Sequence, residues 1–147
     1  MTFEELGVRE DLLRGITDMG FETPMPVQEK VIPVLLNGDR DLVALAQTGT
    51  GKTAAFGLPV LQRVDPLRHV PQALILAPTR ELCLQIAGDL ADFSKYMDDV
   101  TVLPVYGGSS IESQIRALKQ GVQIIVATPG RLIDLINRGV VKLADVH

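Results

Sequence analysis

The chain has 147 residues, of which 46% are apolar, and its formal net charge is −4. This length fits one domain of ordinary size, and the apolar content is too high for a disordered chain. No apolar run approaches the roughly 18 residues that a membrane-spanning helix needs. The negative charge and the 4% of aromatic residues argue against a basic or broadly stacking nucleic-acid surface. Backbone amides and helix N-termini can nevertheless hold phosphates without net positive charge.

The N-terminus and the cysteine content bear on the compartment. The opening residues 1–5 lack the basic and apolar blocks of a signal peptide. The one cysteine, Cys83, cannot form an internal disulfide, which is typical of a reducing compartment. We therefore expect a cytoplasmic protein.

Three segments of helical period occur before residue 94. An apolar stripe from Leu12 to Met19 ends at Gly20, and a second helix is expected from Pro26 to Asn37, with a kink at Pro33 and an end at Gly38. A third stripe runs from Leu82 to Phe93. We interpret these stripes as faces that pack on a core.

Two further helices are predicted by their start signals. Residues 109–112, Ser-Ser-Ile-Glu, have the form of a capping box that opens a helix through Leu118. Thr128 is a predicted N-cap with Pro129 at the first helical position, and Gly139 ends that helix.

Short apolar runs between these segments predict four buried strands. Near-continuous apolar strands that alternate with helices are typical of a parallel sheet covered on both faces, so the fold class is α/β. The predicted strands are Leu42–Ala46, Ala73–Ala77, Val100–Val105 and Val122–Ala127.

The segment after the first predicted strand has the pattern of a phosphate-binding loop. Gly49 and Gly51 permit backbone angles that turn successive amides toward an anion, and the helix that follows adds its positive end. Lys52 would reach the β- and γ-phosphates of a nucleotide, and the Thr53 hydroxyl would ligate Mg²⁺. The alternative is a Gly/Thr-rich turn with a solvated lysine. The full segment is Ala46-Gln47-Thr48-Gly49-Thr50-Gly51-Lys52-Thr53, with alanine where the strict pattern begins with glycine.

Together with this loop, the rest of the chain resembles the DEAD-box family of RNA helicases from Phe3 to Arg131. The resemblance implies a RecA-like three-layer fold, ATP and Mg²⁺ as ligands, and RNA as a partner. It also implies that residues 1–147 are the N-terminal part of the ATP-binding domain, with residues 1–29 as its Q-motif region. A second RecA-like domain would complete the intact protein.

Residues 20–28, Gly-Phe-Glu-Thr-Pro-Met-Pro-Val-Gln, look like the family's Q motif. By resemblance, Gln28 hydrogen-bonds the adenine and Phe21 packs against the base, with Phe3 as the isolated aromatic residue upstream. An amide can pair with adenine N6 and N7 in a way that guanine does not satisfy. The alternative is that Gln28 is an ordinary polar residue of the second helix and Phe21 belongs to the core.

Three short motifs at predicted strand ends resemble the RNA-binding motifs of the family. Each precedes a helix whose first amides could hold the sugar–phosphate backbone independently of base sequence. For the arginine of the first motif the alternative is an ion pair with Glu81 or another surface acid, and for the glycine pair it is a plain strand-to-helix turn. The residues are Pro78, Thr79 and Arg80 (with Cys83 where the family usually has alanine), Gly107 and Gly108, and Thr128, Pro129, Gly130 and Arg131.

The acid that a phosphate-loop ATPase places after a second apolar strand has no counterpart here, and nowhere in the sequence is an Asp followed directly by a Glu. By resemblance, the Asp-Glu-Ala-Asp strand would follow His147, so we expect a fragment that neither hydrolyses ATP nor unwinds RNA alone. Open strand edges would then favour disorder, aggregation or pairing with another chain.

Two other function classes stay open. One is a non-catalytic nucleotide- or RNA-binding module. The other is a different phosphate-loop enzyme, although the Asn-Lys-x-Asp motif of GTPases is absent.

Overall fold

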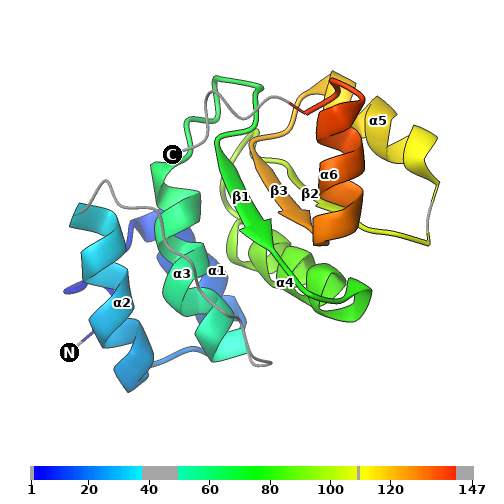
Figure 1. Cartoon of the computed structure of the whole chain (residues 1–147). Coiled ribbons are helices and arrows are strands. Elements are labelled where there is room, and N and C mark those ends of the chain that lie inside the picture. Colours follow the sequence, from blue (N-terminus) through cyan, green and yellow to red (C-terminus); the bar gives the residue numbers. More distant parts are fainter. Residues whose placement is uncertain (1, 38–49, 109, 142–147) are drawn as a thin grey trace. The chain divides into compact units, whose positions relative to one another are not determined.

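The computed structural model describes residues 2–37, 50–108 and 110–141 (Figure 1). The chain divides into two compact units, a helical unit (residues 1–64 and 88–98) and a sheet unit (residues 65–87 and 99–147). The predicted strand Leu42–Ala46 and the predicted helix end at Gly38 lie outside the described residues. The division of the sequence into a Q-motif region and a larger domain stays a prediction.

The helical unit contains α1 (Glu10–Asp18), α2 (Pro26–Asn37), α3 (Thr50–Arg63) and the end of α4 (Arg80–Phe93). The predicted stripe of α1 is confirmed, with Leu12 and Ile16 almost fully buried, and Gly20 follows the helix with a φ of +90°. Helix α2 runs through Pro33 to Asn37 and packs against α3. A kink at Pro33 stays a prediction.

Two glycines allow close helix packing in the helical unit. A Cβ atom on Gly15 of α1 would lie 2.3 Å from the backbone oxygen of Phe93, and one on Gly57 of α3 would lie 2.6 Å from a methyl group of Leu90. Phe93 and Leu90 have no exposed surface. Residues without a side chain are therefore required where α1 and α3 meet the end of α4.

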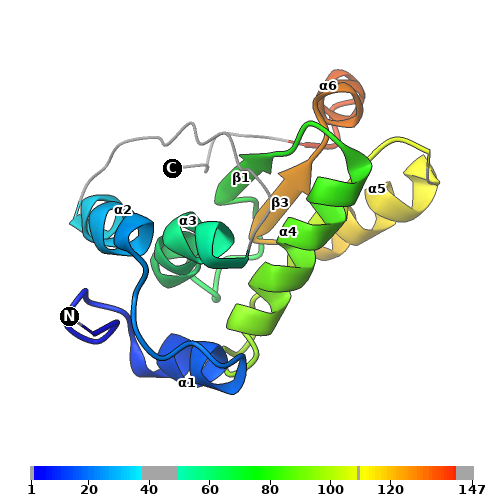
Figure 2. The same cartoon turned by 90° about the horizontal axis from the view of Figure 1, so that it is seen from below.

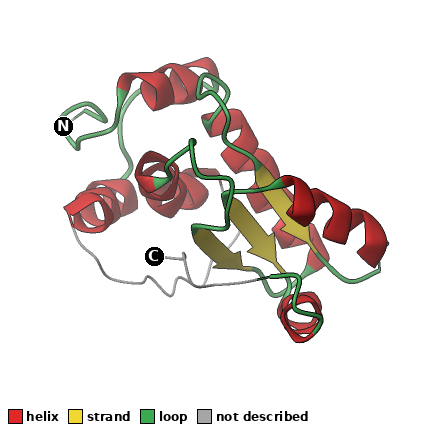
Figure 3. Ribbon diagram, turned by 90° about the horizontal axis from the view of Figure 1, so that it is seen from above, coloured by secondary structure: helices red, strands yellow, loops and turns green. Residues whose placement is uncertain are grey.

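The sheet unit contains three parallel strands, β1 (Ala73–Leu76), β2 (Val102–Val105) and β3 (Ile124–Ala127), in the order β1-β3-β2. All three predicted strands in the described range are confirmed. β3 is the central strand of the three (Figure 3). Its apolar sequence explains this place, because all four of its residues are fully buried. Pro104 lacks an N–H group and lies in β2, an outer strand of the described sheet.

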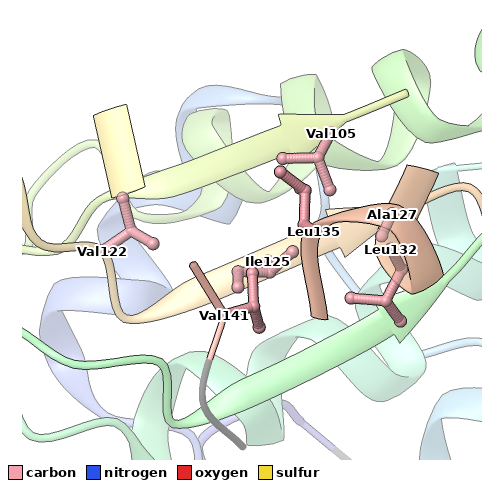
Figure 4. Close-up of a cluster of buried hydrophobic side chains, with 7 residues drawn as sticks. All are labelled: Val105, Val122, Ile125, Ala127, Leu132, Leu135 and Val141. Carbon is pink, nitrogen blue, oxygen red and sulfur yellow. The ribbon is translucent and has the colours of Figure 1, made fainter. Parts of the chain in front are cut away.

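Helices cover both faces of this sheet. α5 (Ile111–Gln120) and α6 (Pro129–Asn137) pack with one face (Figure 4), where the buried cluster is Val105, Val122, Ile125, Ala127, Leu132, Leu135 and Val141. The first part of α4 lies on the other face (Figure 2), where the Cys83 thiol donates to the Val126 carbonyl at 3.1 Å. Burial raises the pKa of Cys83 to about 11. The sheet unit is therefore a three-layer α/β structure.

The capping box predicted at Ser109 is wrong by one residue. Ser110 is the N-cap of α5, and its hydroxyl oxygen accepts from the Ser113 amide at 3.4 Å. The Glu112 carboxylate accepts from the Ser110 hydroxyl at 3.2 Å instead of reaching the cap amide. Two consecutive serines made both N-cap positions possible, because each offers a hydroxyl oxygen that can accept from a first-turn amide. The N-cap position of Thr128 is confirmed, without a side-chain hydrogen bond.

Buried glutamines hold the loops at the amino ends of the strands. The Gln72 amide donates to the carbonyls of Asp65 and Arg68 at 2.8 and 2.9 Å. The Gln123 amide donates to the Asp99 carbonyl at 2.9 Å, and its oxygen accepts from the Thr101 amide at the same distance. Within the described residues, no helix is long and apolar enough to cross a membrane.

The glycine contacts generate a stability prediction. Gly15→Ala places a methyl group against a backbone oxygen that cannot move freely, so we expect the free energy of unfolding to fall by about 1–3 kcal/mol. Gly88→Ala is the matched control, because nothing lies within 4 Å of its added methyl group. Alanine in a helix should raise stability there by about 0.5–1 kcal/mol. Urea unfolding measures both, and equal stability of Gly15→Ala and the unchanged chain would contradict the packing.

Candidate nucleotide and nucleic-acid sites

The three predicted RNA-binding motifs lie at one edge of the sheet unit. Parallel pairing extends past the strands, because the Ala77 amide donates to the Ala127 carbonyl at 2.8 Å and the Thr128 amide donates to the Val105 carbonyl at 3.0 Å. The first residues after the strands are Ala77 for β1, Tyr106 for β2 and Thr128 for β3. The carboxyl ends of all three strands, and the starts of α4, α5 and α6, are therefore together (Figure 1).

The residues of these motifs are accessible. Pro78, Thr79, Arg80, Gly107, Gly108, Pro129 and Gly130 are exposed, while Thr128 and Arg131 are half-buried. Thr79 caps α4, since its hydroxyl oxygen accepts from the Leu82 amide at 3.2 Å. Gly108 has a φ of +81°, a conformation that favours glycine.

Two residues that the sequence reasoning missed connect these motifs. The Arg80 guanidinium lies over the Tyr106 ring, 5.2 Å from its centroid. Among the described residues, no ion pair joins Arg80 to Glu81. The structure therefore does not support the alternative in which Arg80 pairs with that surface acid. The buried Gln114 of α5 accepts from Arg131 Nη1 at 2.9 Å and donates to the Tyr106 carbonyl at 3.2 Å.

Neither residue belongs to a motif that the resemblance supplied. Tyr106 directly precedes the glycine pair, and Gln114 is a polar residue on the inner face of α5. The only sequence signal for Gln114 was a polar side chain among Ile111, Ile115 and Leu118, the apolar positions of that helix.

The predicted adenine-binding residue Gln28 lies in the helical unit, in the first turn of α2. Its side-chain oxygen accepts from the Met25 amide at 2.7 Å, and its exposed fraction is 1%. This bond is half of a capping box, in which a Gln three residues into a helix satisfies the amide of the capping residue. Gln28 therefore has a structural role, and its role in binding adenine stays a prediction.

Phe21 lies in an aromatic group of the helical unit. Its ring stacks on Phe3, with centroids 6.2 Å apart, and meets the edge of Phe93 at 5.9 Å. Phe3 is 4% exposed and Phe21 is half-buried. The isolated aromatic residue near the N-terminus thus supports the first residues of the predicted Q motif.

The described part of the predicted phosphate loop begins at Thr50, and Ala46, Gln47, Thr48 and Gly49 lie outside the described residues. Gly51 and Lys52 are in the first turn of α3, as the motif requires, and Lys52 is exposed. Thr53 is 4% exposed and hydrogen-bonds the carboxylate of Asp89 on α4.

The carboxylate of Asp89, beside Thr53, is a further group of this site that the sequence patterns did not indicate. Burial raises the pKa of its carboxyl group, while the hydrogen bond from Thr53 opposes that rise and the charge of Asp92 adds to it. Its Oδ2 atom is buried and has no hydrogen-bond partner among the described residues.

These groups fit a nucleotide phosphate with magnesium. Hydroxyl and carboxylate oxygens are the ligand types that Mg²⁺ prefers, and a lysine ammonium suits a phosphate. In the described part of the chain, no group of three or more His, Cys, Asp or Glu residues could hold a metal ion alone.

Comparison with known proteins decides the family. The sequence profile of the DEAD/DEAH box helicase family matches residues 25–146. The chain belongs to this family. It is 52% identical over 145 residues to the ATP-dependent RNA helicase DeaD of Escherichia coli K12, and that match covers 99% of this chain and 23% of DeaD. It is 49% identical over 146 residues to the DEAD-box ATP-dependent RNA helicase CshA of Geobacillus kaustophilus, and that match covers 99% of this chain and 31% of CshA.

Solved DEAD-box structures have the same fold. A DEAD box protein from Methanococcus jannaschii matches 99% of this chain and 39% of its own, with a TM-score of 0.90 and 42% identity. Dbp5 of Saccharomyces cerevisiae, solved with RNA and ADP BeF3, matches 99% of this chain and 36% of its own, with a TM-score of 0.83 and 38% identity. The predicted RecA-like α/β fold is confirmed. The chain spans about a quarter to a third of the length of the DEAD-box relatives DeaD and CshA.

Proposed function

We propose that this chain is the ATP- and RNA-binding portion of an ATP-dependent RNA helicase, in which RNA-stimulated ATP hydrolysis is coupled to unwinding of RNA duplexes. The observation that carries the proposal is the convergence of three family motifs at one edge of the sheet unit, in a chain about half identical to RNA helicases. Dbp5, a structural neighbour, was solved with RNA and ADP BeF3 bound.

At the sheet edge, the accessible residues of the three motifs would hold the sugar–phosphate chain of RNA. Arg80 and Arg131 supply charge, and the starts of α4 and α6 supply backbone amides. Such contacts do not depend on base sequence, which suits a helicase that acts on many RNAs. A second RecA-like domain in the longer protein would close over the other side of the RNA.

In the helical unit, Lys52 would hold the β- and γ-phosphates of the nucleotide and Thr53 would ligate Mg²⁺ through its hydroxyl oxygen. Bound ATP, with Mg²⁺, would supply free energy through transfer of its γ-phosphoryl group to water. Gln28 would read the adenine, with Phe21 packed against the base. The amide oxygen of Gln28 accepts a hydrogen bond from the Met25 amide, which holds this side chain in the first turn of α2. We place the protein in the cytoplasm, a proposal that its one unpaired cysteine supports.

Calorimetric titration with ADP and GDP in the presence of Mg²⁺ tests the nucleotide site. We expect ADP to bind at least about tenfold more tightly than GDP, because guanine cannot form the bidentate pair that the Gln28 amide makes with adenine. Lys52→Ala should weaken ADP binding by about tenfold or more, because a charged contact with phosphate disappears.

Gln28→Glu is the matched variant for the base. Its carboxylate keeps an acceptor for the Met25 amide but cannot donate to adenine N7, so affinity for ADP should fall while the melting temperature holds. Gln28→Ala removes both functions and should lower the melting temperature as well. Equal affinity for ADP and GDP would contradict the assignment of Gln28 and leave a phosphate-loop protein of another class.

We also infer that these 147 residues alone bind ATP without turning it over. Neither β1 nor β3 is followed by an acid, and no Asp followed directly by Glu is present to hold Mg²⁺ and orient water. Phosphate release by the purified chain should therefore stay at the level of the Lys52→Ala variant, with or without RNA. Sustained phosphate release that RNA stimulates would contradict this inference.

A further inference from the structure

A buried amide connects two of the RNA-binding motifs in the sheet unit. Gln114 is 5% exposed, and its side chain has one partner on each side. The oxygen accepts from Arg131 Nη1 at 2.9 Å, and the nitrogen donates to the Tyr106 carbonyl at 3.2 Å. Tyr106 directly precedes the glycine pair, and Arg131 ends the Thr-Pro-Gly-Arg motif. The two motifs follow different strands and meet through this one side chain.

The chemistry of both bonds requires a glutamine. The carbonyl of Tyr106 needs a donor and the guanidinium of Arg131 needs an acceptor, and an uncharged amide of this length supplies both. A glutamate would lack the donor and would neutralise the arginine. A leucine would fill the same space and leave a buried carbonyl without its partner.

The same tyrosine contacts the second arginine of the edge. The Arg80 guanidinium lies 5.2 Å from the centre of the Tyr106 ring, and a Cβ atom on Gly108 would come within 3.6 Å of Arg80 Nη1. Of the two arginines that the proposed function assigns to RNA, Arg80 thus lies directly against the segment from Tyr106 to Gly108, and Arg131 is linked to Tyr106 through Gln114. Because the chain has a net charge of −4, its overall charge does not attract RNA. RNA binding then depends on how the guanidinium groups of these two arginines are oriented.

We propose that Gln114 is a positioning residue for RNA binding: it fixes Arg131 toward the phosphate backbone and ties it to the turn that carries the glycine pair. The inference rests on the proposed function, because it presumes that Arg131 binds phosphate. Its physical basis is preorganisation. An arginine already held in one conformation loses less conformational entropy when it binds, so binding is tighter without any added contact.

The test is a double-mutant cycle read by RNA affinity. A short fluorescein-labelled oligouridylate is titrated with the chain and with the variants Gln114→Leu, Arg131→Ala and the double variant, and fluorescence anisotropy gives each dissociation constant. Gln114→Leu should weaken binding by about threefold to tenfold. In the Arg131→Ala background most of that loss should disappear, since the residue through which Gln114 acts is gone. A residue needed only for folding would weaken binding equally in both backgrounds.

Gln72→Leu is the matched control. Gln72 is another buried glutamine of the sheet unit, 6% exposed, and it bonds loop carbonyls before β1, at the amino ends of the strands. Its substitution should lower the melting temperature and leave RNA affinity unchanged. Circular dichroism establishes that each variant is folded at the temperature of the titration.

Gln114→Glu keeps the test open if Gln114→Leu does not fold. The carboxylate retains an acceptor for Arg131 but forms an ion pair with it. RNA affinity should then fall to about that of Arg131→Ala, and the slope of log affinity against log salt concentration should shrink by about one, as for the loss of one phosphate contact.

Three outcomes separate the possibilities. Loss of affinity that depends on Arg131 supports the proposal. Normal RNA binding by a folded Gln114→Leu or Gln114→Glu variant, or a loss that persists fully in the Arg131→Ala background, overturns the role of Gln114 and leaves the proposed function standing. Absence of RNA binding by the unchanged chain overturns the proposed function itself, and the inference with it.

Discussion

The parallel pairing of three short strands is the constraint on which the rest of the sheet unit depends. β3 is buried on both faces and pairs with β1 and β2 in the same direction, so each strand ends at one edge of the sheet. Right-handed crossovers then place α4 on one face and α5 and α6 on the other, with all three helices beginning at that edge. The accessible arginines and glycines gather there because of this topology.

The local features of this fold could be predicted from the sequence because short-range physics decides them. Three apolar runs in the described range gave three strands, and helix ends at Gly20 and Gly139 have the positive φ values that glycine permits. The capping box failed by one residue because two adjacent serines offer the same hydroxyl. The residue pattern does not distinguish the two serines, and Ser110 is the one that caps α5.

The connections between motifs could not be predicted in this way. Motif spacing indicated Arg80, the glycine pair and Arg131, but each was an isolated match. Gln114 bonds Arg131, 17 positions away, and the Tyr106 carbonyl, 8 positions away, while the Tyr106 ring meets the cation of Arg80 at the start of α4. In the helical unit, the carboxylate of Asp89 beside Thr53 was equally invisible, since α3 and α4 are separated by a strand in the sequence.

The most direct test of the central claim is an amide NMR titration of the isotopically labelled chain with a single-stranded RNA. The account predicts chemical-shift changes at the amides of residues 79–80, 107–108 and 130–131, and little change at Gln72 and Gln123 at the opposite ends of the strands. Changes confined to the amino ends of the strands would contradict the claim that the strand-end motifs form the RNA-binding surface.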